Sequence, residues 1–288
     1  MSPAMAARSP ASGVPWTTYL ALAPAVVVLV LLLVVPLTAT VYLSLSPNVL
    51  VQFEGPGLDN FAYLFGKPYY VDVLVRTLRI SFVTALIVLV VGYPAAYVLK
   101  DLSERTGGAL IIALTFPILT GPLIIVLGWM ILLSDGGPLI RPLVRLGLGG
   151  PWRLLGTEAA IVVGLVHFTL PFVVLTIYSS LKQIPNDLVE AARSLGAGAA
   201  QVFRRVVWPL SLPGVLSASI IAFSLAASAY VSPHYLGGAT RLTLTTLVAQ
   251  FILATYNGEM AAAAAVVLLA IMAAIIFLFT RAVSRYVR

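Results

Sequence analysis

Residues 190–209 read EAARSLGAGAAQVFRRVVWP, a charged stretch in a chain with very little charge elsewhere. Only 9% of all residues are charged and 60% are hydrophobic, whereas a soluble domain carries about 25% charged residues. The mean hydropathy is +1.04. The stretch is therefore a polar island within an integral membrane protein.

On both sides of the island, long intervals carry no charged residue. Each interval supplies the ~20 apolar residues with which a helix crosses a ~30 Å hydrocarbon core. Continuous apolar runs favour helices over a barrel, whose strands would alternate in short segments. We expect an all-α integral membrane fold over residues 16–288, preceded by a tail at 1–15. Its six transmembrane helices should lie near 17–44, 74–99, 108–133, 159–181, 212–232 and 259–281.

The distribution of basic residues indicates the orientation in the membrane. Six spans place both termini on one side, together with the segments 100–107 and 182–211. Ten of the seventeen lysines and arginines lie on that side, and basic residues mark the cytoplasmic side. We therefore expect both termini and the 182–211 loop to be cytoplasmic. Arginines that face anionic membrane lipid account for the net charge of +7, so no nucleic-acid partner is expected.

The first half of the island has the signals of a short helix. Asp187 is placed to be its N-cap, and Glu190, three residues later, completes the pattern of a capping box. Gly196 stands where a left-handed residue commonly ends a helix. We predict a helix that begins near 187 and ends at this glycine.

The second half of the island predicts another short helix, over 199–207. Pro209 and Pro213 follow it and are expected to stop it, because proline lacks the backbone donor that a helix needs. Two short helices at an angle would project from the membrane surface as a knob. Physical chemistry alone leaves two interpretations open, a solvated loop anchored to lipid by its arginines and a docking site for another protein.

The island resembles a known motif. Glu-Ala-Ala at 190–192, followed by Gly196 and by Trp208-Pro209, resembles the cytoplasmic "EAA" loop of ABC importer permeases, in which leucine usually stands in place of Trp208. Further matches resemble the spermidine/putrescine-type branch of this family: Leu58-Asp59-Asn60-Phe61, Arg76-Thr77-Leu78, Gly92-Tyr93-Pro94-Ala95-Ala96-Tyr97, Leu170-Pro171-Phe172, Pro213-Gly214 and Leu236-Gly237-Gly238. The resemblance implies the type I ABC importer permease fold in a bacterial cytoplasmic (inner) membrane.

In this family the loop forms a coupling helix that docks in a cleft of a cytoplasmic ATPase subunit. The resemblance carries this role to Glu190, Ala191, Ala192 and Gly196, with Arg204, Arg205 and Pro209 flanking them. It also implies four further subunits: a second permease subunit, commonly a paralogue, two ATP-binding subunits, and an outer substrate-binding protein on loops near 47–70 and 232–258. None of the three lysines follows a glycine and precedes a serine or threonine, so ATP and Mg²⁺ should be used by the partner ATPase and no cofactor bound by this chain.

The solute implied by the resemblance is a polyamine or a related small polar organic molecule. No acidic residue lies deep in a predicted span, although a dication would favour carboxylates or an aromatic cage. His167 is the ionisable group placed well inside a span, where it would either contact solute or bridge two helices. The remaining candidates for the solute path are aromatic, and packing or an interfacial aromatic belt explains most of them: Tyr93, Trp129, Tyr178 and Tyr230. Arg76 and Arg79 are expected to snorkel to the interface.

Two other classes of membrane protein compete with this interpretation. A secondary carrier driven by an ion gradient remains the alternative, although such carriers usually show inverted repeats and a buried acid or coordinating backbone at midplane. A membrane enzyme is disfavoured, because two histidines and no cysteine form no His-Glu-x-x-His motif or comparable metal cluster. We therefore expect a non-catalytic transport subunit without a metal site.

Overall fold

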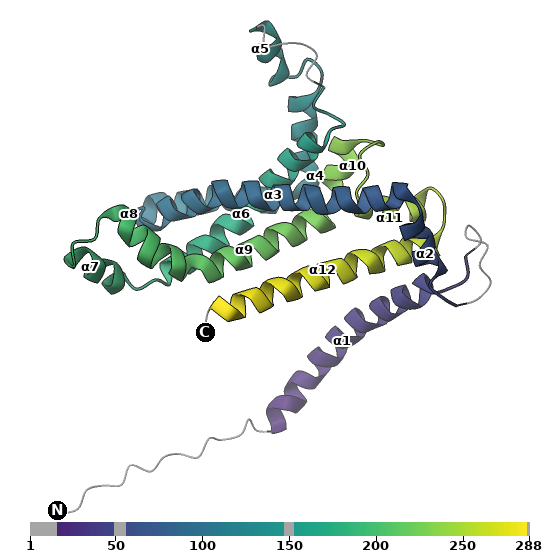
Figure 1. The fold of residues 1–288 in the computed structure, drawn as a ribbon, viewed down its shortest axis with the longest axis horizontal. Helices are drawn as coiled ribbons and strands as arrows, with labels where there is room; N and C mark the ends of the chain where they lie inside the picture. Colours follow the sequence, from purple (N-terminus) through teal and green to yellow (C-terminus); the bar gives the residue numbers. More distant parts are fainter. Residues whose placement is uncertain (1–15, 49–55, 147–152, 287–288) are drawn as a thin grey trace, which may run out of the picture.

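The computed structural model describes residues 16–48, 56–146 and 153–286, and most of these residues are helical (Figure 1). The predicted tail at 1–15 lies outside the described residues. In chain order the elements are α1 (Trp16–Ser44), α2 (Asp59–Gly66), α3 (Pro68–Lys100), α4 (Glu104–Leu133), α5 (Ile140–Arg145), α6 (Glu158–Lys182), α7 (Asn186–Ser194), α8 (Ala199–Val202), the π-helical turn η2 (Phe203–Val207), α9 (Trp208–Ser228), α10 (Val231–Gly237), α11 (Leu244–Leu253) and α12 (Gly258–Tyr286).

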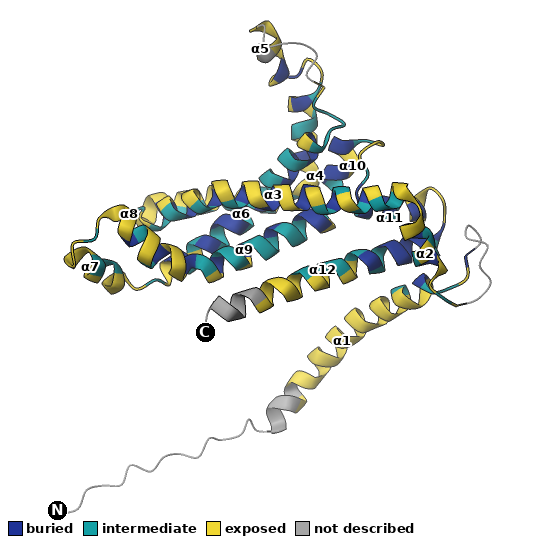
Figure 2. Ribbon diagram, in the orientation of Figure 1, coloured by how far each residue is buried: buried dark blue, intermediate teal, exposed yellow. Residues whose placement is uncertain are grey.

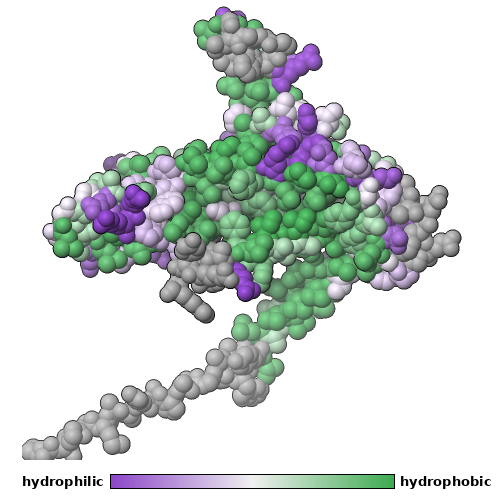
Figure 3. Space-filling view, in the orientation of Figure 1, coloured by the Kyte–Doolittle hydropathy of each residue, from purple (hydrophilic) through white to green (hydrophobic). Residues whose placement is uncertain are grey.

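Six helices in the described part of the chain are long and apolar enough to cross a membrane: α1, α3, α4, α6, the continuous α8–η2–α9 helix, and α12. The all-α, six-helix fold class is confirmed. Figure 3 shows a mainly hydrophobic flank, with hydrophilic residues gathered at the α7–α8 end and around α10. A flank of this kind suits contact with lipid.

Two of these helices depart from their expected bounds. The second, α3, begins at Pro68 instead of near 74. The fifth runs from Ala199 to Ser228 instead of from 212 to 232, because neither Pro209 nor Pro213 stops it. The prediction that these prolines end the helix was wrong.

The centre of the molecule is a tight bundle of α3, α6 and α9. Small residues bring the backbones close together. A Cβ atom added to Gly92 of α3 would lie 3.1 Å from Val173 of α6, and one added to Gly214 of α9 would overlap the side chain of Ser180. Close backbone approach of this kind is how helices associate in lipid, where no hydrophobic driving force operates between them.

Two smaller apolar clusters lie toward the end of the bundle that carries α10 and α11, opposite the end with α7 and α8 (Figure 1). In one, Leu247 and Phe251 of α11 pack against Met260 and its neighbours on α12. In the other, α10 packs against α4 and α6, with Leu236 fully buried next to Gly164. These clusters hold the short helices against the ends of the long ones.

Of the six helices, α1 and α4 have the smallest buried share in their most apolar stretch, and Figure 2 shows α1 exposed along its length. None of the most apolar stretch of α1 is buried, and its main neighbour is α12. The helical path of α4 is broken at Gly121, whose φ of 76° and ψ of 157° are not helical and which directly precedes Pro122. Both helices leave long apolar faces for lipid or for another membrane subunit.

The close contact of α6 and α9 makes a testable prediction. Gly214→Ala should destabilise the protein by about 1–3 kcal/mol, the usual cost of overpacking, because the new methyl group overlaps Ser180. Thermal unfolding of the purified protein in detergent measures the effect, and Ser180→Gly in the same chain should restore stability.

The matched control is Gly128→Ala in α4, where an added Cβ meets nothing within 4 Å. This change should be neutral or slightly stabilising, since alanine is the better helix former. Equal melting temperatures for the two single variants would contradict the close contact.

Candidate functional site

The segment 186–207, which we call the α7–η2 knob, stands out at the end of the bundle away from α10 and α11 (Figure 1). No residue of α7 is buried, and the side chains of Leu188 and Leu195 are 46% and 89% exposed. The predicted docking residues are accessible: Glu190, Ala191, Gly196, Arg204, Arg205 and Pro209 are exposed and Ala192 is half-buried. Apolar side chains held out from a folded domain are typical of a protein-binding surface.

The start of α7 differs from the prediction. The helix begins at Asn186, its N-cap residue is Pro185, and no side chain caps it. Asp187 lies inside the first turn, where its charge is favourable beside the helix N-terminus. The capping box formed by Asp187 and Glu190 was therefore wrong, because the N-cap is Pro185, two residues earlier than that pattern requires.

The end of α7 agrees with the prediction. Gly196 has a φ of +85°, its N–H donates to the carbonyl of Arg193 at 2.9 Å, and the N–H of Ala197 donates to the carbonyl of Ala192 at 3.1 Å. This pair of bonds is a Schellman motif, which needs a left-handed residue after the helix. Glycine adopts that conformation without strain, so Gly196 sets the direction in which the chain leaves α7.

The junction between the knob and the bundle is the π-helical turn η2. In a straight α-helix the ring of Pro209 would collide with the carbonyl of Arg205, four residues earlier. The wider π turn directly before Trp208 relieves this collision, and the N–H of Trp208 donates to the carbonyl of Phe203. The chain can thus continue as one helix from α8 into α9.

Tyr93, one of the residues predicted on the solute path, lies against this junction. Its ring centroid is 5.2 Å from that of Trp208 and 6.0 Å from that of Phe203, both in edge-on geometry. Its hydroxyl is 2.9 Å from the hydroxyl of Ser211, which is fully buried. No local sequence pattern indicates this contact, since Tyr93 and Ser211 are 118 residues apart in the chain.

Trp129 and His167 are brought together inside the bundle. The Nε1–H of Trp129 on α4 donates to Nδ1 of His167 on α6 at 3.0 Å, and the rings are perpendicular. Tyr178 lies about three turns further along α6, below the ammonium of Lys182. The predicted path residues on the long helices therefore occupy separate levels of the bundle instead of one pocket.

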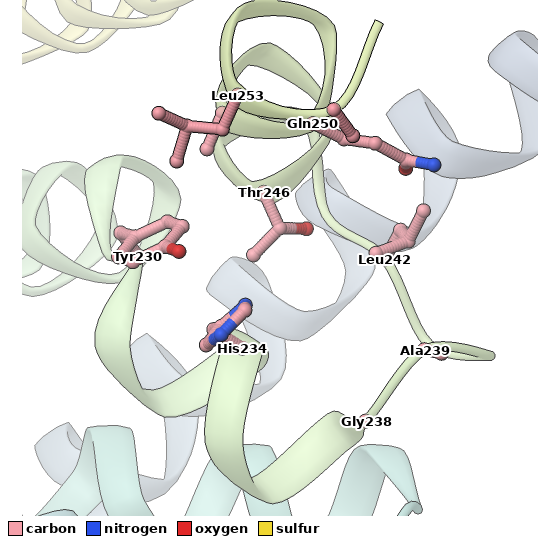
Figure 4. Close-up of a pocket in the computed structure, with 10 residues that line it drawn as sticks. Tyr230, His234, Gly238, Ala239, Leu242, Thr246, Gln250 and Leu253 are labelled. Carbon is pink, nitrogen blue, oxygen red and sulfur yellow. The ribbon is translucent and has the colours of Figure 1, made fainter.

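Tyr230 lines a pocket of about 320 Å³ between α10 and α11 (Figure 4). Its ring stacks on that of His234 with centroids 5.0 Å apart. Thr246 and Gln250 of α11 contribute the polar groups on the opposite wall, and the other lining side chains are apolar. The pocket carries no acidic side chain, so its aromatic rings and amide are the groups available to a cation.

Arg76 and Arg79, which we expected to snorkel to the membrane interface, both form ion pairs. Arg76 pairs with Asp72 at 2.7 Å and with Glu158 at 3.4 Å, and Arg79 pairs with the same Glu158. Arg76 also donates to the carbonyl of Leu242, 166 residues later in the chain. These contacts join α3 to the start of α6 and to the segment before α11.

A buried amide network was not anticipated. The Nδ2 of Asn48 donates to Oδ1 of Asn60 at 2.9 Å and to Oδ1 of Asn257 at 3.0 Å. The Nδ2 of Asn60 in turn donates to the carbonyl of Ser44, the last residue of α1. The Asn60 position belongs to the Leu-Asp-Asn-Phe stretch singled out in the sequence. The network ties the end of α1 to α2 and to the start of α12.

Comparison with known proteins places the fold in a family. Residues 81–288 match the model described as "Binding-protein-dependent transport system inner membrane component". The "Spermidine/putrescine transport system permease protein PotB" of Haemophilus influenzae is 33% identical over 226 residues, which cover 78% of this chain and 79% of that relative.

Two solved ABC transporters have similar chains. The structure of a bacterial transporter involved in the import of the acidic polysaccharide alginate superposes with a TM-score of 0.79 at 17% identity, covering 94% of this chain and 96% of that chain. The inward-facing MetNI methionine transporter superposes with a TM-score of 0.60 at 25% identity, covering 77% of this chain and all of that chain. The fold is therefore that of a type I ABC importer permease. The chain belongs to the binding-protein-dependent transport system inner membrane components, the multi-pass permease subunits of ABC importers.

Proposed function

We propose that this permease takes a polyamine or a related small polar organic solute across the bacterial inner membrane. The observation that carries the choice of solute is the 33% identity to PotB over most of both chains, since PotB is named for spermidine and putrescine. The aromatic pocket at Tyr230 and His234 is compatible with an amine-bearing chain, because ring faces attract cations.

We further propose that the α7–η2 knob docks on a separate ATPase subunit. The knob exposes Leu188 and Leu195 next to Glu190, a combination that suits an apolar cleft with a polar rim. The only lysine that follows a glycine, Lys67, precedes a proline instead of the serine or threonine that a phosphate-binding loop needs. ATP and Mg²⁺ therefore belong to the partner, and this subunit is not catalytic. The knob passes the movement of the ATPase to the bundle.

The other assignments follow from this docking. The knob, both termini and the 1–15 tail are cytoplasmic, while α10 and α11 face the outer side. A second permease subunit, of the same or a paralogous sequence, completes the passage, and two ATP-binding subunits drive it. An outer substrate-binding protein rests on the α2 and α10–α11 side. The alginate transporter, solved in complex with a substrate-bound periplasmic protein, supports this arrangement by analogy.

Uptake by the reconstituted complex tests the proposal. Proteoliposomes that contain both permease subunits and the ATPase should accumulate labelled putrescine or spermidine only with ATP and the binding protein, and vanadate should stop the uptake. An ion-gradient carrier is the alternative. Uptake that persists in vanadate and stops with an ionophore would establish the carrier instead.

A substitution in the knob tests its role in docking. Gly196→Asp should lower ATP-dependent uptake about tenfold or more, because a side chain at a φ of +85° costs about 1–2 kcal/mol and misdirects the chain after α7. Insertion into the membrane should be unchanged, which immunoblots of membrane fractions measure.

Gly198→Asp is the matched control, since it adds the same charge two residues later at a φ of −69°, where aspartate is a good N-cap for α8. It should retain most of the uptake. Normal uptake by Gly196→Asp would contradict the docking role.

The Trp129–His167 pair makes a prediction about the solute path. Trp129→Phe and His167→Leu should each raise the KM for uptake severalfold, and the double variant should raise it no further, because the two residues act as one unit. If the pair only joins α4 to α6, each variant would instead lower the free energy of unfolding by about 1 kcal/mol or less and leave KM unchanged. Phe168→Leu, whose ring contacts Phe172, is the control.

A further inference from the structure

We propose that four aromatic residues around η2 form the joint through which the knob moves the bundle, with Tyr93 and Phe203 as its positioning residues. The four residues are Tyr93 and Tyr97 of α3, Phe203 of η2 and Trp208 of α9, and we call them the aromatic joint. The inference deepens the proposed function and rests on it, because it assumes that the knob is driven by an ATPase.

The ring contacts fasten both ends of the π turn to α3. Phe203 is the first residue of η2, and it meets the rings of Tyr93 and Tyr97 edge-on at 6.0 Å and 5.5 Å. Trp208 is the first residue after η2, and it meets Tyr93 at 5.2 Å. Edge-to-face ring pairs have a preferred geometry, so they resist sliding of one helix along another. A displacement of η2 is therefore passed to α3.

A hydrogen bond fastens the same tyrosine to α9. Ser211 donates its hydroxyl hydrogen to the carbonyl of Trp208 at 2.9 Å. The Tyr93 hydroxyl, 2.9 Å away, is then the donor to Ser211. Because Ser211 is fully buried, water does not replace this bond readily. Tyr93 thus contacts the π turn through its ring and α9 through its hydroxyl.

The aromatic joint lies where a movement of the knob must pass into the membrane helices. Helix α7 packs chiefly on α8 and η2, the first part of the long α8–η2–α9 helix. Beyond η2 the backbone continues directly into α9, which packs on α3 and α6. A π turn inside a helix is often found at functional positions. Here it lies directly before Trp208 and Pro209, at the point where the knob joins the membrane helices.

The test measures coupling in the complete complex in proteoliposomes, as solute molecules taken up per ATP hydrolysed. Phe203→Leu should lower this ratio roughly two- to tenfold, as expected for the loss of ring contacts, while the ATPase still co-purifies with the permease. Tyr93→Phe removes only the hydroxyl and should lower the ratio roughly twofold or more. Phe203→Tyr keeps the aromatic ring and should keep the wild-type ratio of solute taken up to ATP hydrolysed.

The control is Phe172→Leu, which removes one ring of the Phe168–Phe172 pair on α6, outside the joint. It should leave the ratio at the wild-type value. Wild-type ratios for both Phe203→Leu and Tyr93→Phe would overturn the joint, as would loss of the bound ATPase in Phe203→Leu. ATP-driven uptake by the unmodified complex tests the proposed function separately, and only differences from that complex bear on the joint.

Discussion

The close approach of three helix backbones is the constraint on which the rest of the molecule depends. In lipid, apolar side chains gain little by facing each other instead of the acyl chains, so helices associate where small residues let their backbones meet. Gly92 and Gly214 supply two such points between α6 and its neighbours α3 and α9. A third, Gly164, leaves room on α6 for Leu236 of α10. The knob is connected to the end of α6 and to the start of α9. Because these two helices pack closely, both connections belong to one rigid body.

The features that the sequence predicted well are local ones. Charge-free intervals of about twenty residues are long enough to cross a bilayer by themselves, so six helices could be predicted without knowing how they pack. The left-handed turn at Gly196 is equally local, because the hydrogen bonds of a helix end involve only adjacent turns. The resemblance to the EAA loop likewise depends on residues close together in the chain, and it led to the correct family.

The features that the sequence did not predict depend on tertiary contacts. Pro209 would end an isolated helix, yet here the π turn and the aromatic contacts keep the helix continuous. Arg79 pairs with Glu158, 79 residues away, and a rule about membrane interfaces alone cannot supply that partner. Tyr93 was a candidate both for the solute path and for packing, because composition does not reveal how a helix is rotated about its own axis. Its actual neighbours became known only from the packing of α3 against α9.

The amide network at Asn48 has a consequence for the order in which the molecule is built. Asn48 and Asn60 lie twelve residues apart, so this pair can form as soon as α2 follows α1. The bonds between Asn48 and Asn257 span 209 residues and must wait until the chain has been made as far as the start of α12. Since α1 packs mainly on α12, α1 is made long before the helix that it packs against. During synthesis α1 is thus anchored on its own until α12 completes the contact.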